Sequence, residues 1–362
     1  MIIVRPDAYR QYPAGRNRFV LVLEQQFSGS FRIEPPSRYE AWDTVTAEPG
    51  RSLTDVLRSG IPQDTDVLVV AQDARLLTAP AAQVGPHRTV AALRAGTGPF
   101  ALDQLRGLLA ALEKTDPDAL GRTRAVLGDA LAAAGGLVIE EPLTASVAKM
   151  AFAAPTWSRT DTGTFLPGVV QSAPTGLQRL DLTSAGTTLT GQIAVKGWSV
   201  VRTRADDQAR SQELFEKLSG LSHYPLVLTV EDGTVTDMKA TETGSATAAA
   251  ALTRLFAADP HHAEVTGLEF GTNPVAPQLP FNSESNAAAT GKAAASVHLL
   301  LGTLPRTEFQ IVLDCATSSL TALGGTTPLA GAGAGAGAAS ASAGQSPRRR
   351  MNRVTAASCG CH

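Results

Sequence analysis

The stretch YPLVLTVEDGTVTDMKAT, from Tyr224 to Thr241, predicts two strands joined by a tight turn. Apolar and polar residues alternate on both sides of Asp232-Gly233. Such alternation is typical of strands with one buried face, and Asp-Gly is typical of a two-residue hairpin turn. Residues 175–203, TGLQRLDLTSAGTTLTGQIAVKGWSVVRT, alternate in the same way, with glycine where turns are expected. The chain from about residue 151 onward is therefore predicted to be a β-rich, α+β domain.

The first part of the chain has a different pattern. RFVLVLEQQF (18–27) and DVLVVAQDARLLTA (66–79) each contain a short Val/Leu run suited to a buried strand. FALDQLRGLLAALEKTD (100–116) repeats leucine at helical spacing, and another strand is expected at Leu137 to Glu140. Strands alternating with helices predict an α/β domain with a parallel sheet. We expect an α/β N-terminal domain at 1–150, a β-rich domain at 151–325, a Gly/Ala/Ser linker at 326–347 and a tail at 348–362.

Composition excludes several classes of protein. The 362 residues carry a formal net charge of −2, and the four arginines at 348–353 have no acidic neighbour, so the rest of the chain is mildly acidic. This balance argues against a nucleic-acid-binding surface. No apolar run approaches the roughly 18–20 residues of a membrane span, and no secretory signal is apparent. Cys315 is the one cysteine of the body, so no disulfide framework is expected. These features indicate a cytoplasmic protein.

Two segments contain residues that could bind a metal. In LEFGTNP (268–274), Glu269 lies between apolar residues, and in ASVHLLLGT (295–303), His298 stands in an apolar run. Taken singly, each has an ordinary interpretation, as an exposed glutamate and a core histidine. Taken together, a Glu and a His presented from neighbouring strands are ligand types that zinc and iron sites use.

The order of five segments, VVQSAPTG, LTVEDGTVTDM, LEFGTNP, SVHLLLG and IVLD, resembles the thermophilic aminopeptidases, a leucyl aminopeptidase-like family of metallopeptidases. It also resembles in pattern the related dihydroxypyridine dioxygenases. The resemblance implies an α/β domain followed by a β-rich, aminopeptidase-like domain, and a homodimer. It also implies metal-activated attack on an N-terminal peptide bond, or iron-dependent ring cleavage.

The family's ligand motifs are only partly matched. Glu269 and His298 stand at the family's glutamate and histidine. The family's first motif has a carboxylate just before an Ala-Pro, where this chain has Val169 and Val170. For the family's His-x-Asp motif, TEFQIVLD (307–314) offers Glu308 and Gln310. The resemblance thus implies a residual site of Glu269, His298 and Glu308, holding one zinc or iron ion weakly. Because a two-metal centre would lack ligands, the sequence favours a non-catalytic protein.

The C-terminal segment carries its own chemistry. Residues 330–344, AGAGAGAGAASASAG, are typical of a flexible linker, so we expect a disordered tail. Beyond it lie a basic run suited to docking or proteolytic processing and a small set of thiols and polar groups: Arg348, Arg349 and Arg350, then Ser358, Cys359, Cys361 and His362. The tail resembles the core peptide of a ribosomally synthesised, post-translationally modified peptide precursor.

Three functions follow from these patterns. In the first, an aminopeptidase-like body without catalytic activity is the leader and scaffold that presents its own SCGCH peptide to modifying enzymes. In the second, the chain is a metal-dependent aminopeptidase-like hydrolase, or a related iron dioxygenase, that uses Glu269 and His298. In the third, it handles metal with the C-terminal Cys-x-Cys-His. The expected partners are peptide-modifying enzymes and a second copy of the chain, not nucleic acid or a membrane.

Overall fold

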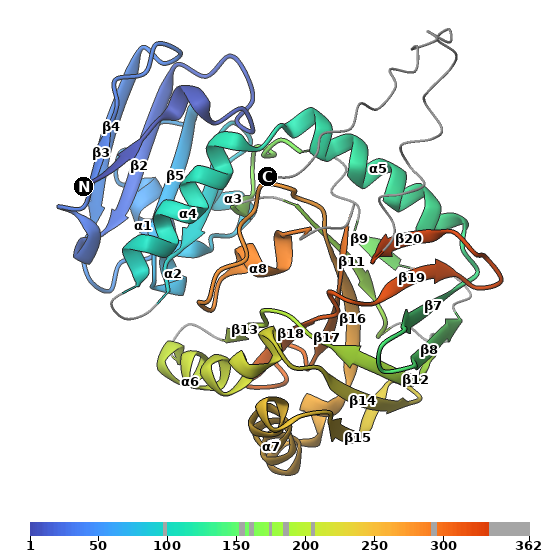
Figure 1. The fold of residues 1–362 in the computed structure, drawn as a ribbon. Helices are drawn as coiled ribbons and strands as arrows, with labels where there is room; N and C mark the ends of the chain where they lie inside the picture. The colour runs from blue at the N-terminus through green and yellow to red at the C-terminus, as the bar shows by residue number, and fades with distance from the viewer. Residues whose placement is uncertain are drawn as a thin grey trace, which may run out of the picture.

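The described residues form a five-stranded parallel sheet, two larger antiparallel sheets and a small two-stranded parallel sheet, and Figure 1 shows how their strands are arranged. The computed structural model describes residues 1–96, 100–151, 156–158, 163–173, 176–183, 188–203, 207–290 and 295–332. Within these residues, no helix is both long and apolar enough to cross a membrane.

The parallel sheet has helices on both faces. Its strands, in spatial order, are β10 (Val170–Ser172), β6 (Thr89–Arg94), β5 (Thr65–Ala71), β2 (Arg18–Glu24) and β4 (Ala41–Ala47). A separate pair is formed by β1 (Ile2–Val4) and β3 (Phe31–Ile33). The accompanying helices are α1 (Leu53–Arg58), α2 (Ala74–Leu77), α3 (Ala81–Val84) and α4 (Ala101–Lys114), with the short 3₁₀ turns Pro6–Ala8 and Gln25–Phe27.

Successive side chains of β2 point to opposite faces of the parallel sheet, and helices cover both faces. Leu21 and Leu23 point into a cluster with the leucines of α4, whereas Val20 and Val22 point into a cluster with α1. At the start of α1, the Ser52 hydroxyl accepts a hydrogen bond from the Asp55 N–H at 3.2 Å, and the Asp55 carboxylate accepts one from the Ser52 N–H at 3.1 Å. The predicted α/β arrangement around a parallel sheet is confirmed.

The second part of the chain is a sandwich of two antiparallel sheets. The six-stranded sheet contains β13 (Val200–Thr203), β18 (Phe309–Asp314), β17 (Ser296–Leu301), β16 (Val265–Gly271), β11 (Leu177–Asp181) and β9 (Thr156–Ser158). The seven-stranded sheet contains β15 (Thr234–Ala240), β14 (Leu226–Glu231), β12 (Thr188–Val195), β8 (Ser146–Ala151), β7 (Gly136–Glu141), β19 (Ser319–Ala322) and β20 (Pro328–Gly331). The remaining helices are α5 (Pro117–Ala133), α6 (Gln208–Leu218), α7 (Thr243–Ala258) and α8 (Glu284–Ala288), with 3₁₀ turns at Ser219–Ser222 and Pro260–Ala263.

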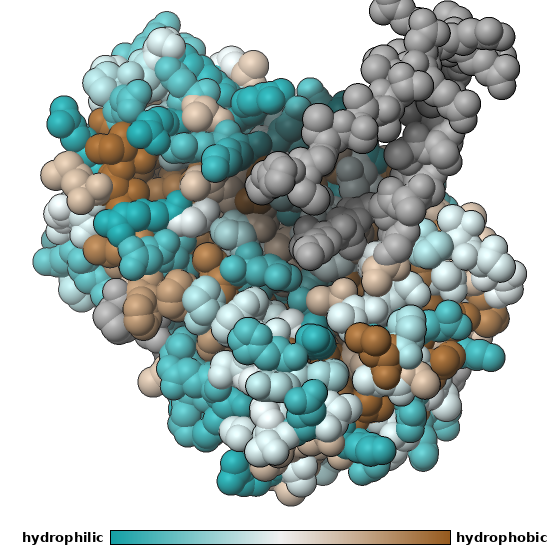
Figure 2. Space-filling view, in the orientation of Figure 1, coloured by the Kyte–Doolittle hydropathy of each residue, from teal (hydrophilic) through white to brown (hydrophobic). Residues whose placement is uncertain are grey.

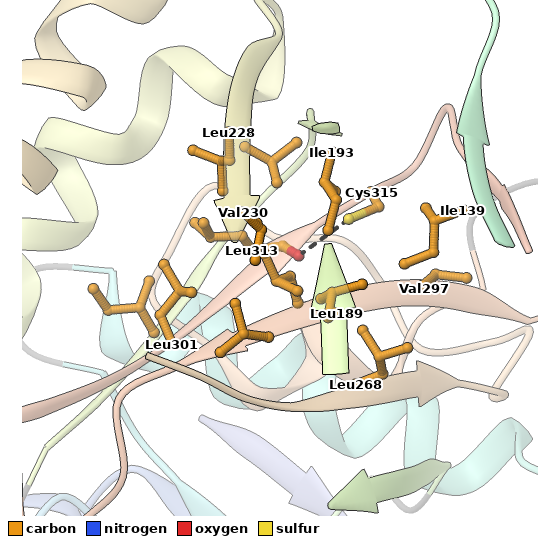
Figure 3. Packing of buried hydrophobic residues seen from close by; sticks show 14 of the residues in the cluster. Ile139, Leu189, Ile193, Leu228, Val230, Leu268, Val297, Leu301, Leu313 and Cys315 are labelled. Atoms are coloured by element: carbon orange, nitrogen blue, oxygen red, sulfur yellow. Dashed lines mark hydrogen bonds between the residues drawn. The ribbon is translucent and has the colours of Figure 1, made fainter. Parts of the chain in front are cut away.

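Aliphatic side chains from both antiparallel sheets form one core (Figure 3). Leu228 and Ile193 come from the seven-stranded sheet, and Leu268 and Leu313 come from the six-stranded sheet. Cys315 is fully buried in this core. The removal of these apolar side chains from water is the main stabilising contribution to such a sandwich.

The predicted hairpin is confirmed as β14 and β15. Asp232 and Gly233 both have positive φ, at 48° and 77°, which the two central residues of a type I′ turn require. Strands β14 and β15 pair antiparallel from Leu226 opposite Ala240 to Glu231 opposite Thr234.

Two expectations about segments are wrong. The strand expected at Leu137 to Glu140 exists as β7, but it pairs antiparallel with β8 and β19 and so belongs to the sandwich. A short apolar run does not reveal the direction of its partners. Within the expected linker, β20 pairs with β19, and Ala330 is fully buried, because its small side chain fits the closely packed edge of the core. The start of the linker at 326 is therefore also wrong.

The sandwich core allows a matched test of packing. Leu299→Ala removes a fully buried side chain, and Leu143→Ala removes one that is 85% exposed. We expect the first to lower the free energy of unfolding by about 2–5 kcal/mol and the second to change it by less than about 0.5 kcal/mol. Urea unfolding followed by circular dichroism measures both, and equal effects would contradict this placement of the core.

Candidate functional site

A row of ionisable side chains crosses the three central strands of the six-stranded sheet. Glu269 of β16 lies directly opposite His298 of β17, and His298 lies directly opposite Asp314 of β18. Directly opposed residues share one face of a sheet. Their chain neighbours Leu268, Leu299 and Leu313 point into the sandwich core, so the row occupies the other face. The three side chains of the row are buried.

The structure brings Glu269 and His298 together but not Glu308. The Glu308 carboxylate accepts a hydrogen bond from Arg210 at 2.9 Å near the surface, outside the row. Asp314 takes the third place in the row, and the sequence reasoning missed it. The signal was in the quoted segment IVLD, since Gln310, Val312 and Asp314 must share a face of one strand.

Arg202 of β13 is bonded to two carboxylates at this site. Its guanidinium donates to both oxygens of Glu269, at 2.8 and 3.0 Å, and to both oxygens of Glu284 of α8, at 2.9 and 2.8 Å. A fifth hydrogen bond, of 3.1 Å, goes to the side-chain carbonyl of Gln310. A guanidinium has five N–H donors, and here each has an acceptor. The sequence reasoning did not identify Arg202 because arginine is not a metal ligand.

Burial makes this cluster of charges interdependent. Burial lowers the pKa of Arg202, but Glu269 and Glu284 outweigh it and hold that pKa well above its usual value. Burial raises the pKa of Glu284, but Arg202 outweighs it and holds that pKa below its usual value. Arg202 and Glu284 therefore depend on the ion pairs of this cluster to compensate for their burial.

His298 and Asp314 form the other end of the row, where burial disfavours charge. The His298 Nε2 lies 3.6 Å from Asp314 Oδ1 and 3.5 Å from the Ser296 hydroxyl. Burial lowers the pKa of His298 to about 4 and raises the pKa of Asp314 well above its usual value. His298 is therefore neutral near pH 7, and burial favours the protonated form of Asp314. At Gly197, where φ is +144°, an added Cβ would lie 2.1 Å from Asp314 Oδ2, so only glycine fits beside this carboxyl group.

The residues implied as metal ligands do not fit a metal ion in this arrangement. Both oxygens of Glu269 bind Arg202, whose charge repels a divalent cation, and Glu308 is paired with Arg210. Among the described residues, no group of three His, Cys, Asp or Glu side chains is placed to hold a metal. Val170 lies in β10 of the parallel sheet and contributes no carboxylate. The predicted tail residues, Arg348, Arg349, Arg350, Ser358, Cys359, Cys361 and His362, lie outside the described residues.

Beside the Arg202 cluster lies a cavity between the parallel sheet and the sandwich. Helix α8, which carries Glu284, lies between these two parts in Figure 1. The cavity has a volume of about 200 Å³ and is lined by Arg94 at the end of β6, Ser172 of β10, Thr203 of β13 and Glu284. A smaller pocket shares Arg94 and Glu284 and adds Asn282. The carboxyl ends of parallel strands are the usual place for ligands in α/β folds.

Contacts between the two parts hold this region together. The rings of Phe100, before α4, and Phe281, before α8, stack with centroids 5.0 Å apart. The amide of Gln104 donates to the Asn282 carbonyl at 3.2 Å, and the Asn282 side chain exchanges two hydrogen bonds of 2.8 Å with the backbone of Val201.

On the face drawn in Figure 2, hydrophobic side chains of described residues lie in small separate groups.

Comparisons with known proteins give weak similarities of fold. The sequence matches no protein-family profile and no curated protein. The 2,5-dihydroxypyridine dioxygenase of Pseudomonas putida KT2440 is similar with a TM-score of 0.49 and 11% identity, over 85% of this chain and 88% of that chain. Wild-type AmpT from Thermus thermophilus is similar with a TM-score of 0.43 and 11% identity, over 87% of this chain and 93% of that chain. Similarities this low assign neither an activity nor a site.

Replacing Arg202 tests the charge cluster. We expect Arg202→Met to lower the free energy of unfolding at pH 7 by about 3–5 kcal/mol, because Glu269 and Glu284 would remain buried without a partner. Arg202 holds the folded-state pKa of Glu284 below its usual 4.5, so this stabilisation is present above pH 4.5 and is lost as pH falls through the folded-state value. The difference in free energy of unfolding between Arg202→Met and the parent should therefore become smaller as the pH falls.

The matched control is Arg210→Met, which removes an exposed partner of Glu308. Exposed ion pairs contribute about 0–1 kcal/mol, so this variant should unfold nearly as the parent does. Urea unfolding at several pH values measures both variants. If Arg202→Met lowers the free energy of unfolding only slightly at pH 7, or by the same amount at every pH, the stabilising role of the buried cluster is contradicted.

Proposed function

We propose that the body of this protein is a non-catalytic scaffold. The observation that supports this is the guanidinium of Arg202, fixed by Glu269 and Glu284 beside the residues that the resemblance implies as metal ligands. A guanidinium bonded at all five donors cannot bind and deprotonate water as a Lewis-acidic metal does. In this proposal, Arg202 stabilises the fold where a metallopeptidase would hold its metal.

The rest of the row also lacks catalytic chemistry. A general base must reach the proton that it removes, and a nucleophile must reach the substrate. His298 is 1% exposed and Asp314 is 2% exposed, so neither meets a substrate in this conformation. Burial disfavours the charged form of both groups, which suits a structural role. We therefore favour the scaffold over a working aminopeptidase-like hydrolase or dioxygenase.

The second part of the proposal concerns the C-terminal peptide. Two of the three cysteines lie within the last four residues, beside Ser358 and the terminal His362. We propose that peptide-modifying enzymes act on Ser358, Cys359 and Cys361 while the body serves as their leader, and that Arg348, Arg349 and Arg350 mark the processing or docking segment. The basis for this part is the sequence, since the segment lies outside the described residues.

Metal content and peptidase activity test the first part. The protein used should carry Cys359→Ser, Cys361→Ser and His362→Ala, so that the tail adds no metal of its own. After dialysis against zinc, manganese or iron(II) buffers, we expect less than about one-tenth of an equivalent of metal and no cleavage of leucine 4-nitroanilide. A stoichiometric metal that is lost, together with activity, in Glu269→Ala would overturn the scaffold. In the unmutated tail, metal binding that disappears with these three substitutions would instead support metal handling by the Cys-x-Cys-His.

Intact-mass spectrometry tests the second part. The full chain is expressed together with the genes that neighbour its own, and fragments are compared with those from the chain expressed alone. We expect a mass change confined to the fragment after Arg350. A variant with Ser358→Ala, Cys359→Ala and Cys361→Ala should lose that change. An unchanged tail, or a change in the body, would contradict the proposed modification.

A further inference from the structure

The cavity beside the Arg202 cluster holds a guanidinium with no bonded partner among the described residues. Arg94 ends β6 and lines both the 200 Å³ cavity and the smaller pocket. It is half-buried, yet no hydrogen bond or close ion pair joins it to any described side chain or carbonyl. Burial lowers the pKa of Arg94 while Glu284 raises it, so the two are near each other in space. Five N–H donors facing a cavity call for an acceptor that the fold does not provide.

Arg94 contrasts with Arg88, an arginine of the same half that is buried. The guanidinium of Arg88 donates to the backbone carbonyls of Leu57, Pro62, Gln83 and Val84 at 3.0–3.2 Å. Arg88 is thus a structural residue whose donors are used inside the protein. The N–H donors of Arg94, by contrast, have no acceptor among the described residues, and Arg94 lines the cavity.

The neighbouring crevice of the sheet is filled by the protein itself. One oxygen of Glu24, at the end of β2, accepts hydrogen bonds from the backbone N–H groups of Gln72 and Asp73, at 2.6 and 3.0 Å. In a sheet of this strand order, the gap between β2 and β5 is where ligands commonly bind. Because a carboxylate of the chain occupies that gap, the space left for a ligand is displaced to the ends of β6 and β10.

The charges around Arg94 select the ligand. Arg94 and Arg202 carry two positive charges, and Glu269 and Glu284 carry two negative ones. A ligand with one negative charge can pair with Arg94. The second charge of a phosphate dianion would lie near the Glu284 carboxylate, and no other cation is among the described residues that line the cavity. The planar fork of a guanidinium matches the two oxygens of a carboxylate.

The rest of the cavity suits a small apolar group. Leu77 of α2, Leu108 of α4 and Ala92 of β6 line it, and its polar groups besides Arg94 and Glu284 are the hydroxyls of Thr78, Ser172 and Thr203. We propose that this cavity binds a small monocarboxylate with an aliphatic body, with its carboxylate on Arg94 and its aliphatic part against Leu77 and Leu108. This site is independent of the scaffold role proposed above.

Isothermal titration calorimetry on the full-length protein tests the site with defined probes. The probes are acetate, butanoate and 4-methylpentanoate, with 4-methylpentanamide and inorganic phosphate for comparison. We expect 4-methylpentanoate to bind more tightly than acetate, and neither the amide nor phosphate to match it. Arg94→Gln should weaken binding by about 10- to 100-fold, as for the loss of hydrogen bonds to a charged group.

Two further variants keep the test decisive. Arg254→Gln removes an exposed arginine from a different groove, between α6 and α7, and should bind as the parent does. Thr78→Phe places a ring at an exposed lining position of the cavity, and it should weaken binding even if Arg94→Gln proves unstable by circular dichroism. Failure of all three carboxylates to bind, equal binding by Arg94→Gln and the parent, or tighter binding of phosphate would overturn the proposal. Metal bound at Glu269 would overturn the scaffold role but leave this result standing, since these titrations contain no metal.

Discussion

The guanidinium of Arg202 is the contact on which the polar side of the sandwich depends. It joins β13, β16, β18 and α8 through Glu269, Gln310 and Glu284. Helix α8 is only five residues long, so tertiary contacts hold it on the sheet, and this bonding acts there together with the hydrogen bonds of the Asn286 side chain. The same helix forms one wall of the cavity. Removing the positive charge would therefore affect stability and the shape of the cavity together.

Much of the fold could be predicted because its signals are local. Asp232-Gly233 specifies the hairpin, and the Val/Leu runs before residue 80 specify the parallel strands. The predictions that failed concerned properties set by residues far away in the chain. A run such as Leu137 to Glu140 fits a strand of either direction, and only pairing with β8 and β19 decides which. The Gly/Ala composition around Ala330 hid β20, since few apolar atoms are needed to fill a closely packed edge.

The candidate site could be predicted in part for the same reason. Glu269 and His298 are conspicuous as ionisable residues in apolar runs, and the structure places them opposite each other. Arg202 lies 67 residues before Glu269 in the chain, so no spacing rule connects the two. Asp314 was missed because strand register decides which residue of 308–314 faces His298. Arg94 is one of many strand-end arginines by sequence, and its position in the wall of the cavity, which distinguishes it, depends on the packing of distant segments.

The route of the chain affects how the cavity can change its width. After α4 the chain passes to the sandwich, returns to add β10 to the parallel sheet, and leaves again into β11. Three covalent connections thus join the parts that form the two walls. A single linker permits wide hinge rotation, whereas three separate crossings restrain it. The cavity should therefore be largely preformed, and ligands should enter without separation of the two parts.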